Sequence, residues 1–105
     1  MKAIIQGNRY DTERATLIGE AGSDCGHGDF KFWEAGLYVT PRSGKYFIAG
    51  RGGVMSRFAV SHGNGSYSGG EAILPMDRAT AFEWAQSELT TAEVEAAFGD
   101  MIQDA

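Results

Sequence analysis

The first two-thirds of the chain alternates short apolar and polar stretches, with glycine or asparagine between many of them. This pattern is typical of antiparallel strands joined by tight turns. Residues 2–6 and 9–10 form two such stretches on either side of Gly7-Asn8, and both of these residues tolerate the positive φ of a hairpin turn. We therefore predict an N-terminal hairpin whose turn lies at Gly7-Asn8.

Two interpretations are open for residues 11–21. The polar residues 11–13 can cap a short helix through Ala15, or they can turn the chain directly into a strand. Because the threonine, leucine and isoleucine at 16–18 suit a pleated surface, we favour a strand over 15–21.

A hairpin over residues 30–49 is the clearest local pattern. Apolar residues in 33–39 fall on one parity, whereas Phe30 and Phe32 fall on the other, which predicts a bulge or kink near Phe32-Trp33 where the apolar face changes sides. The Pro-Arg-Ser-Gly sequence at 41–44 is a turn, and 45–49 is the returning strand.

Glycine dominates the next segment, with seven glycines among residues 50–70. The run 54–60 inside this segment is compatible with either a short helix or a strand. Residues 71–74 predict a last short strand that Pro75 closes, since proline cannot donate to a sheet ladder.

Two helices are predicted at the C-terminal end. Asp77 is the N-cap of a helix to about Leu89, with Phe82, Ala85 and Leu89 facing a core. The sequence Thr-Thr-Ala-Glu at 90–93 fits a capping box for a second helix, whose apolar stripe is Val94, Ala97, Phe98 and Ile102. Gly99 stands where a left-handed C-terminal residue is expected.

Together these elements predict an α+β fold: an antiparallel β-meander of about four to five strands with two short C-terminal helices. The chain of 105 residues, with 43% apolar residues, is sized for a single domain over 1–105. Within it, 1–74 is the β-rich part and 75–105 the acidic helical part.

No membrane association or secretion is expected. The longest apolar runs are only a few residues, far short of the ~20 that span a bilayer. Residues near the start lack the apolar core of a signal peptide. Cys25 is the single cysteine and has no internal partner for a disulfide, so we expect a reducing bacterial cytoplasm.

Charge is segregated along the chain, whose formal net charge is −5. Residues 1–70 hold eight Lys/Arg and six Asp/Glu, about +2, whereas 71–105 hold one arginine and eight acids, about −7. Such an excess repels polyanions and attracts basic surfaces. The C-terminal acids are therefore either a solvated helix face or a docking surface for a basic partner; the candidates are Glu83, Glu88, Glu93, Glu95, Asp100 and Asp104.

Direct nucleic-acid binding is disfavoured. Aromatic residues at 33, 38, 46, 47 and 67 are available to stack bases, but a stacking platform normally accompanies a basic groove. The chain has nine Lys/Arg against fourteen Asp/Glu. Core packing and sheet pairs explain these aromatic residues better.

The glycine-rich loops carry the alternative function. Cys25 and His27 stand two residues apart, and His62 is the only other histidine, but their spacing matches no catalytic or metal signature. Glycines around Arg51 at 50–53 can form a backbone nest for an anion, with Arg57 nearby, although ordinary turn geometry is favoured. The alternative function is therefore a small enzyme or a ligand-binding protein that uses Cys25, His27, Arg51, Arg57 and His62. We assign no catalytic residue, metal or cofactor.

Several segments resemble a family of small uncharacterised proteins encoded on bacterial plasmids, phages and conjugative elements. They are IQGNRYDTERA (5–15), DFKFWE (29–34), LY (37–38), GKYF (44–47), GRGG (50–53) and EAILP (71–75). The resemblance covers most of the chain and supplies no catalytic motif. It implies a mobile-element origin and a role such as inhibiting a host defence complex, and small acidic anti-CRISPR proteins are similar in size and charge.

The leading prediction is thus a non-enzymatic protein-binding module of mobile-element origin, of the anti-CRISPR type. Its acidic helices would dock on a basic host protein or ribonucleoprotein complex that handles nucleic acid, where complementary charge speeds association.

Overall fold

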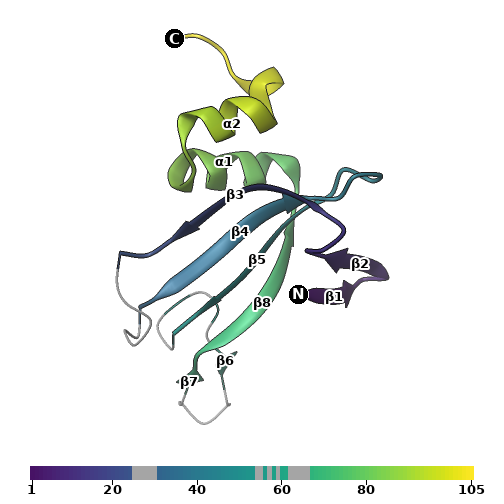
Figure 1. Cartoon of the computed structure of the whole chain (residues 1–105), viewed down its shortest axis with the longest axis vertical. Coiled ribbons are helices and arrows are strands. Elements are labelled where there is room, and N and C mark those ends of the chain that lie inside the picture. Colours follow the sequence, from purple (N-terminus) through teal and green to yellow (C-terminus); the bar gives the residue numbers. More distant parts are fainter. Residues whose placement is uncertain (25–30, 54–55, 57, 59, 62–66) are drawn as a thin grey trace.

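The computed structural model describes residues 1–24, 31–53, 56, 58, 60–61 and 67–105. The predicted α+β fold of antiparallel strands and two short C-terminal helices is confirmed (Figure 1). The elements are β1 (Lys2–Ile5), β2 (Asn8–Asp11), β3 (Thr16–Gly22), β4 (Trp33–Val39), β5 (Tyr46–Gly52), β6 (Val60–Ser61), β7 (Tyr67–Ser68), β8 (Gly70–Met76), α1 (Arg78–Glu88), α2 (Thr91–Phe98) and the 3₁₀ turn η1 (Gly99–Met101).

The central sheet has the order β3-β4-β5-β8, with every neighbouring pair antiparallel. β1 and β2 form one two-stranded sheet, and β6 and β7, which lie on the connection between β5 and β8, form another. Figure 1 shows α1 and α2 together at one end of the sheet and the β1–β2 hairpin apart from them. The strand that we favoured over 15–21 is confirmed as β3, which begins and ends one residue later than predicted.

The two predicted turns are present, and one is displaced. Ile5 pairs with Asn8, so the first hairpin turns at Gln6-Gly7 and not at Gly7-Asn8. Both turn residues have positive φ, 51° and 80°, as a two-residue hairpin turn requires. At the second turn Gly44 has φ 63° and donates its N–H to the carbonyl of Thr40, as predicted for a left-handed glycine.

No bulge interrupts β4, which begins at Trp33 and pairs with β5 in regular register as far as Val39. Phe32 precedes the strand, and its carbonyl accepts the N–H of Gly53 at 2.8 Å. The irregularity lies instead in β3, between Leu17 and Gly19. The extra residue there places both Ile18 and Gly19 toward the helices.

The assignment of 50–53 to a loop is wrong, since β5 continues to Gly52 with partners in both β4 and β8. Likewise β8 does not end before Pro75 but continues to Met76. This proline is tolerated because β8 is an edge strand, where one side of the backbone has no ladder partner. The boundary between the β-rich and helical parts therefore falls after residue 76.

Both helix starts are as predicted. The Asp77 side chain accepts the N–H of Thr80 at 2.8 Å, and Thr90 with Glu93 forms a reciprocal capping box. Gly99 differs from the prediction, because its φ of −53° is right-handed and it opens η1. The chain thus tightens by one 3₁₀ turn, and Ile102 is left 39% exposed.

The sheet has an apolar cluster on each face. The larger cluster lies under the helices and includes Leu37, Ile48, Ala81, Ala85 and Phe98, all with no exposed surface. The smaller cluster lies under the β1–β2 hairpin; its buried members are Tyr10, Phe47, Ala49 and Ile73. The alternation predicted for 33–39 is confirmed, with its apolar parity on the helix side.

Of the helices described here, none combines the length and apolar character needed to cross a bilayer. The loop residues Cys25, His27, Arg57 and His62 lie outside the described residues, as does most of the predicted helix or strand over 54–60.

Candidate functional site

The six predicted acidic residues do not form one uniform face. Two of them hold the fold: Glu93 accepts hydrogen bonds from the N–H and hydroxyl of Thr90, and Asp100 binds Arg78. Glu95 and Asp104 border a hollow at the α2 end. Glu83 and Glu88 instead lie on α1, beside a larger cleft.

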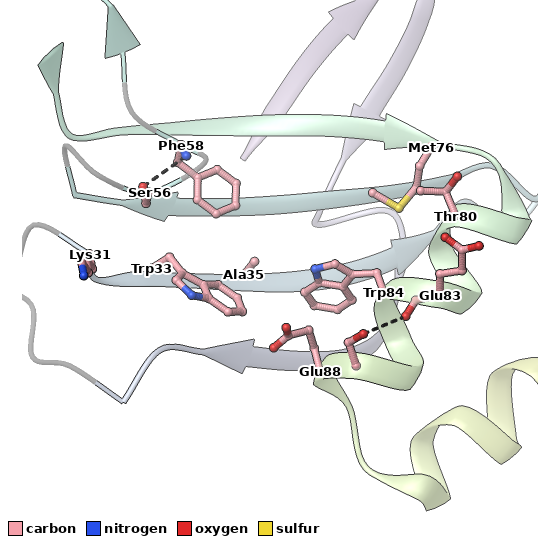
Figure 2. Close-up of a pocket in the computed structure, with 11 residues that line it drawn as sticks. Lys31, Trp33, Ala35, Ser56, Phe58, Met76, Thr80, Glu83, Trp84 and Glu88 are labelled. Atoms are coloured by element: carbon pink, nitrogen blue, oxygen red, sulfur yellow. Dashed lines mark hydrogen bonds between the residues drawn. The ribbon is translucent and has the colours of Figure 1, made fainter.

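This cleft lies between α1, the sheet and the chain after β5, and has a volume of about 660 Å³. Figure 2 shows the indole rings of Trp33 from β4 and Trp84 from α1 along it, with Ala35 between them. Phe58 lines the β5 side. The remaining lining residues are Lys31, Ser56, Met76, Thr80, Glu83, Ser87 and Glu88.

Local packing explains how α1 presents its polar flank to the cleft. Ala81 and Ala85 are completely buried, and such small side chains let the helix backbone lie close to the sheet. Trp84 and Glu88 are one turn apart on α1, so both side chains project from the same flank. An indole and a carboxylate therefore share one wall of the cleft.

The opposite wall depends on a glycine. A Cβ on Gly50 would lie 2.6 Å from the ring of Phe58 and 2.6 Å from the backbone oxygen of Glu34. Glycine therefore makes room for Phe58 against β5. Ser56 fixes this segment, since its hydroxyl donates to the carbonyl of Gly53 at 2.8 Å and accepts the N–H of Phe58 at 3.2 Å.

Polar groups are unevenly distributed around the cleft. Glu83 and Glu88 are exposed at its α1 side, whereas Lys31 lies at the far end, beyond Trp33 (Figure 2). Among the residues that the structure describes, neither glutamate forms an ion pair. The α1 end of the cleft thus combines aromatic surface with uncompensated negative charge.

A second aromatic and acidic arrangement lies on the same helices and is already occupied. The guanidinium of Arg78 lies 5.8 Å from the centre of the Phe98 ring and donates to both Asp100 oxygens, at 2.8 and 2.5 Å. It also donates to the Tyr46 hydroxyl at 3.2 Å. These hydrogen bonds lower the pKa of Asp100 and raise that of Arg78.

The backbone nest considered around Arg51 is not seen at residues 50–52. Residues 50–52 are extended, and their backbone groups belong to the β5 ladders, so no nest of converging N–H groups exists there. Arg51 instead pairs with Glu34 on the neighbouring strand, and Glu71 is its register partner on the other side. The guanidinium is thus already paired with a carboxylate, which disfavours an added anion.

A hollow of about 240 Å³ lies on this hairpin face beside Glu20 and Tyr38. Burial, and secondarily the negative charge of Glu20, raise the pKa of the Tyr38 hydroxyl. Within the described part of the chain, no group of three His, Cys, Asp or Glu residues is placed to hold a metal ion.

The charge pattern points to Glu83 and Glu88, but no sequence pattern reveals the cleft beside them. Trp33 fits a sheet face by its parity, and Trp84 lies outside the predicted patterns. One signal was available: Trp84 stands outside the apolar stripe formed by Phe82, Ala85 and Leu89, although tryptophan is costly to expose.

Comparison with known proteins adds no relative: no protein-family model, curated protein or solved structure matches the chain.

Proposed function

We propose that this protein is a non-enzymatic binding module that docks the acidic side of its C-terminal helices on a basic partner protein. One observation carries the proposal. Glu83 and Glu88 are exposed and lack an ion pair among the described residues, and they stand beside a cleft walled by aromatic rings. Aromatic anchors next to complementary charge are characteristic of protein interfaces.

Complementary charge would act mainly on association. An excess of about seven negative charges after residue 70 draws a basic surface toward the helices and speeds encounter at low salt. Rim charges alone contribute little affinity. The aromatic walls would therefore supply the contact area that keeps the complex together.

The partner we propose is a host protein or ribonucleoprotein complex with a basic nucleic-acid-binding groove, in the bacterial cytoplasm. The resemblance to proteins of mobile elements supports this setting, as does the acidic charge. In this version the protein inhibits a defence complex in the manner of anti-CRISPR proteins, by occupying a groove that otherwise holds nucleic acid.

Docking can be tested with a fluorescently labelled decapeptide of alternating arginine and glycine, since its charge and length are defined. We expect binding to weaken steeply between about 50 mM and about 300 mM salt, because screening shortens the range of the interaction. Glu88→Lys and Glu95→Lys should each weaken binding. Salt-independent binding, or variants that bind as well as the parent protein, would contradict the proposal.

The biological version needs its own test. Bacteria with an active CRISPR system are challenged with a targeted phage, with and without this protein, and plaques are counted. Restored plaques that are lost again in Glu88→Lys support an inhibitor of host defence. Unchanged plaque numbers across several system types would reject that role and leave the docking proposal in place.

A further inference from the structure

We infer that the cleft between Trp33 and Trp84 is the anchor pocket for an arginine side chain of the partner, with its guanidinium at Glu88. This rests on the proposed function, because it names the group that the acidic side receives. It is nevertheless a separate claim about one cleft and one chemical group.

The shape and polarity of the cleft favour a long side chain with a cationic end. Its walls are two indoles and a phenyl ring, and its volume of about 660 Å³ lies within the usual range for ligand pockets. Figure 2 shows the Glu88 carboxylate beside the space between Trp33 and Trp84. An aliphatic stem can lie on the rings while its charged end reaches this carboxylate.

Charge sets the direction in which such a side chain enters. Lys31 lines the end of the cleft away from α1, and Glu83 and Glu88 line the α1 end. A cation is therefore favoured at the α1 end, where both carboxylates lie. An anionic ligand would meet these two carboxylates beside the indole of Trp84.

Elsewhere in the same protein, an aromatic ring and a carboxylate together bind an arginine. Arg78 lies over the ring of Phe98 and forks onto Asp100, using the same ring-plus-carboxylate chemistry that Trp84 and Glu88 present one helix turn apart. In the occupied case the arginine belongs to this chain. In the cleft, we infer, it comes from the partner.

Arginine is favoured over lysine for a physical reason. A guanidinium is planar, so it stacks on an indole and offers two parallel N–H groups to one carboxylate. An ammonium is a compact and strongly hydrated charge, which gains less from a ring face and loses more water on entry. The cleft should therefore distinguish the two cations.

The test uses N-acetyl-arginine amide as the probe and the ¹H–¹⁵N spectrum of the indole groups as the readout. The chain has two tryptophans, so two indole signals are expected, and Trp84→Phe assigns them. Saturable shifts of both signals should appear on titration. N-acetyl-citrulline amide, which has nearly the same shape without the charge, should shift them much less, and N-acetyl-lysine amide should bind more weakly than the arginine probe.

Two variants complete the test. Glu88→Gln should weaken binding of the arginine probe about threefold or more, because the guanidinium loses its charged partner. Glu95→Gln removes the same charge from α2, away from the cleft, and should change affinity by less than about 1.5-fold.

Each outcome decides a specific point. Absent or non-saturating shifts, equal binding of citrulline, or no effect of Glu88→Gln would overturn the anchor pocket. Equal binding of lysine would overturn the selectivity for guanidinium. If the decapeptide binds in a salt-sensitive way while the single-residue probe does not, the anchor inference fails and the docking function stands.

Discussion

Glu34 on the hairpin face of the central sheet and the two α1 glutamates on the helix face have different neighbours. On the face under the β1–β2 hairpin, Glu34 pairs with Arg51, and Glu71 is the register partner of Arg51 on the other side. On the helix face, Glu83 and Glu88 have no cationic partner among the described residues and stand next to aromatic rings. A carboxylate balanced within the molecule serves the fold, whereas one left unbalanced beside an apolar cleft is available to a partner.

The two faces also differ in how their apolar clusters pack. Truncating a buried side chain of the helix-side cluster should have the largest effect of all on stability. Phe98 is fully buried, contacts the rings of Tyr46 and Phe82, and lies under Arg78, so Phe98→Ala should cost about 3–5 kcal/mol of unfolding free energy. Tyr10→Ala, under the hairpin, should cost less, because among the described residues Tyr10 meets only the Phe47 ring, edge-on. Urea unfolding measures both.

The reverse order of these two costs would mean that the hairpin cluster, and not the helix cluster, dominates stability. Ile4→Ala is the matched control, since Ile4 is 70% exposed and its truncation should change stability by less than about 0.5 kcal/mol.

A smaller loss of stability is expected from a substitution at Gly50, where the cleft meets the sheet. Gly50→Ala would place a Cβ 2.6 Å from both the Phe58 ring and a backbone oxygen, and should cost about 1–3 kcal/mol through overpacking. Gly99→Ala is the control. A Cβ added there would have no neighbouring atom within 4 Å, and the φ of −53° suits alanine, so this variant should stabilise the fold by about 0.4–1 kcal/mol.

Indole fluorescence would report whether the cleft itself moves. We expect Gly50→Ala to shift the emission because Phe58, which lines the cleft together with both tryptophans, must leave its place. Gly99→Ala should leave the emission unchanged. A stable Gly50→Ala protein with unaltered emission would show that the chain absorbs the extra methyl elsewhere.

The smallest predicted effect concerns the ion pair between Arg78 and Asp100. Hydrogen bonds from Arg78 lower the pKa of Asp100 below its usual 3.8, so the pair stabilises the fold at neutral pH and loses this contribution as pH falls through the lowered pKa. Asp100→Asn should be less stable than the parent protein at neutral pH. The difference should close below about pH 4.

Urea midpoints measured between neutral and acid pH test this directly. The N-cap Asp77 has its pKa lowered by its bond to Thr80 in both proteins, so its own titration cancels in the comparison. A stability difference that stays constant with pH would show that Asp100 acts through packing instead of charge.

Features set by a few neighbouring residues could be predicted from the sequence. The caps at Asp77 and Thr90 each need a side chain and an N–H three residues apart, and Gly44 needs only a turn that favours positive φ. Local chemistry determines these features, so the helix starts and the 30–49 hairpin followed from pattern alone.

Features that depend on distant contacts could not be predicted. Gly50 and Gly52 seemed to mark a loop, yet they lie in a strand and make room for Phe58 and Ser56, which follow later in the chain. The cleft likewise requires Trp33, Phe58 and Trp84, which come from three segments that meet only in the folded sheet. The acidic residues beside it could be named, but not the surface that they border.

The most direct test of the account compares matched charge reversals on the two faces. Glu83→Lys with Glu88→Lys changes the helix face, and Glu20→Lys with Glu71→Lys makes the same change in net charge at exposed positions of the hairpin face. We expect the first pair to weaken binding of the arginine–glycine decapeptide about tenfold or more, and the second by about twofold. Equal losses from both pairs would show that only net charge matters and would contradict a docking site on the helix face.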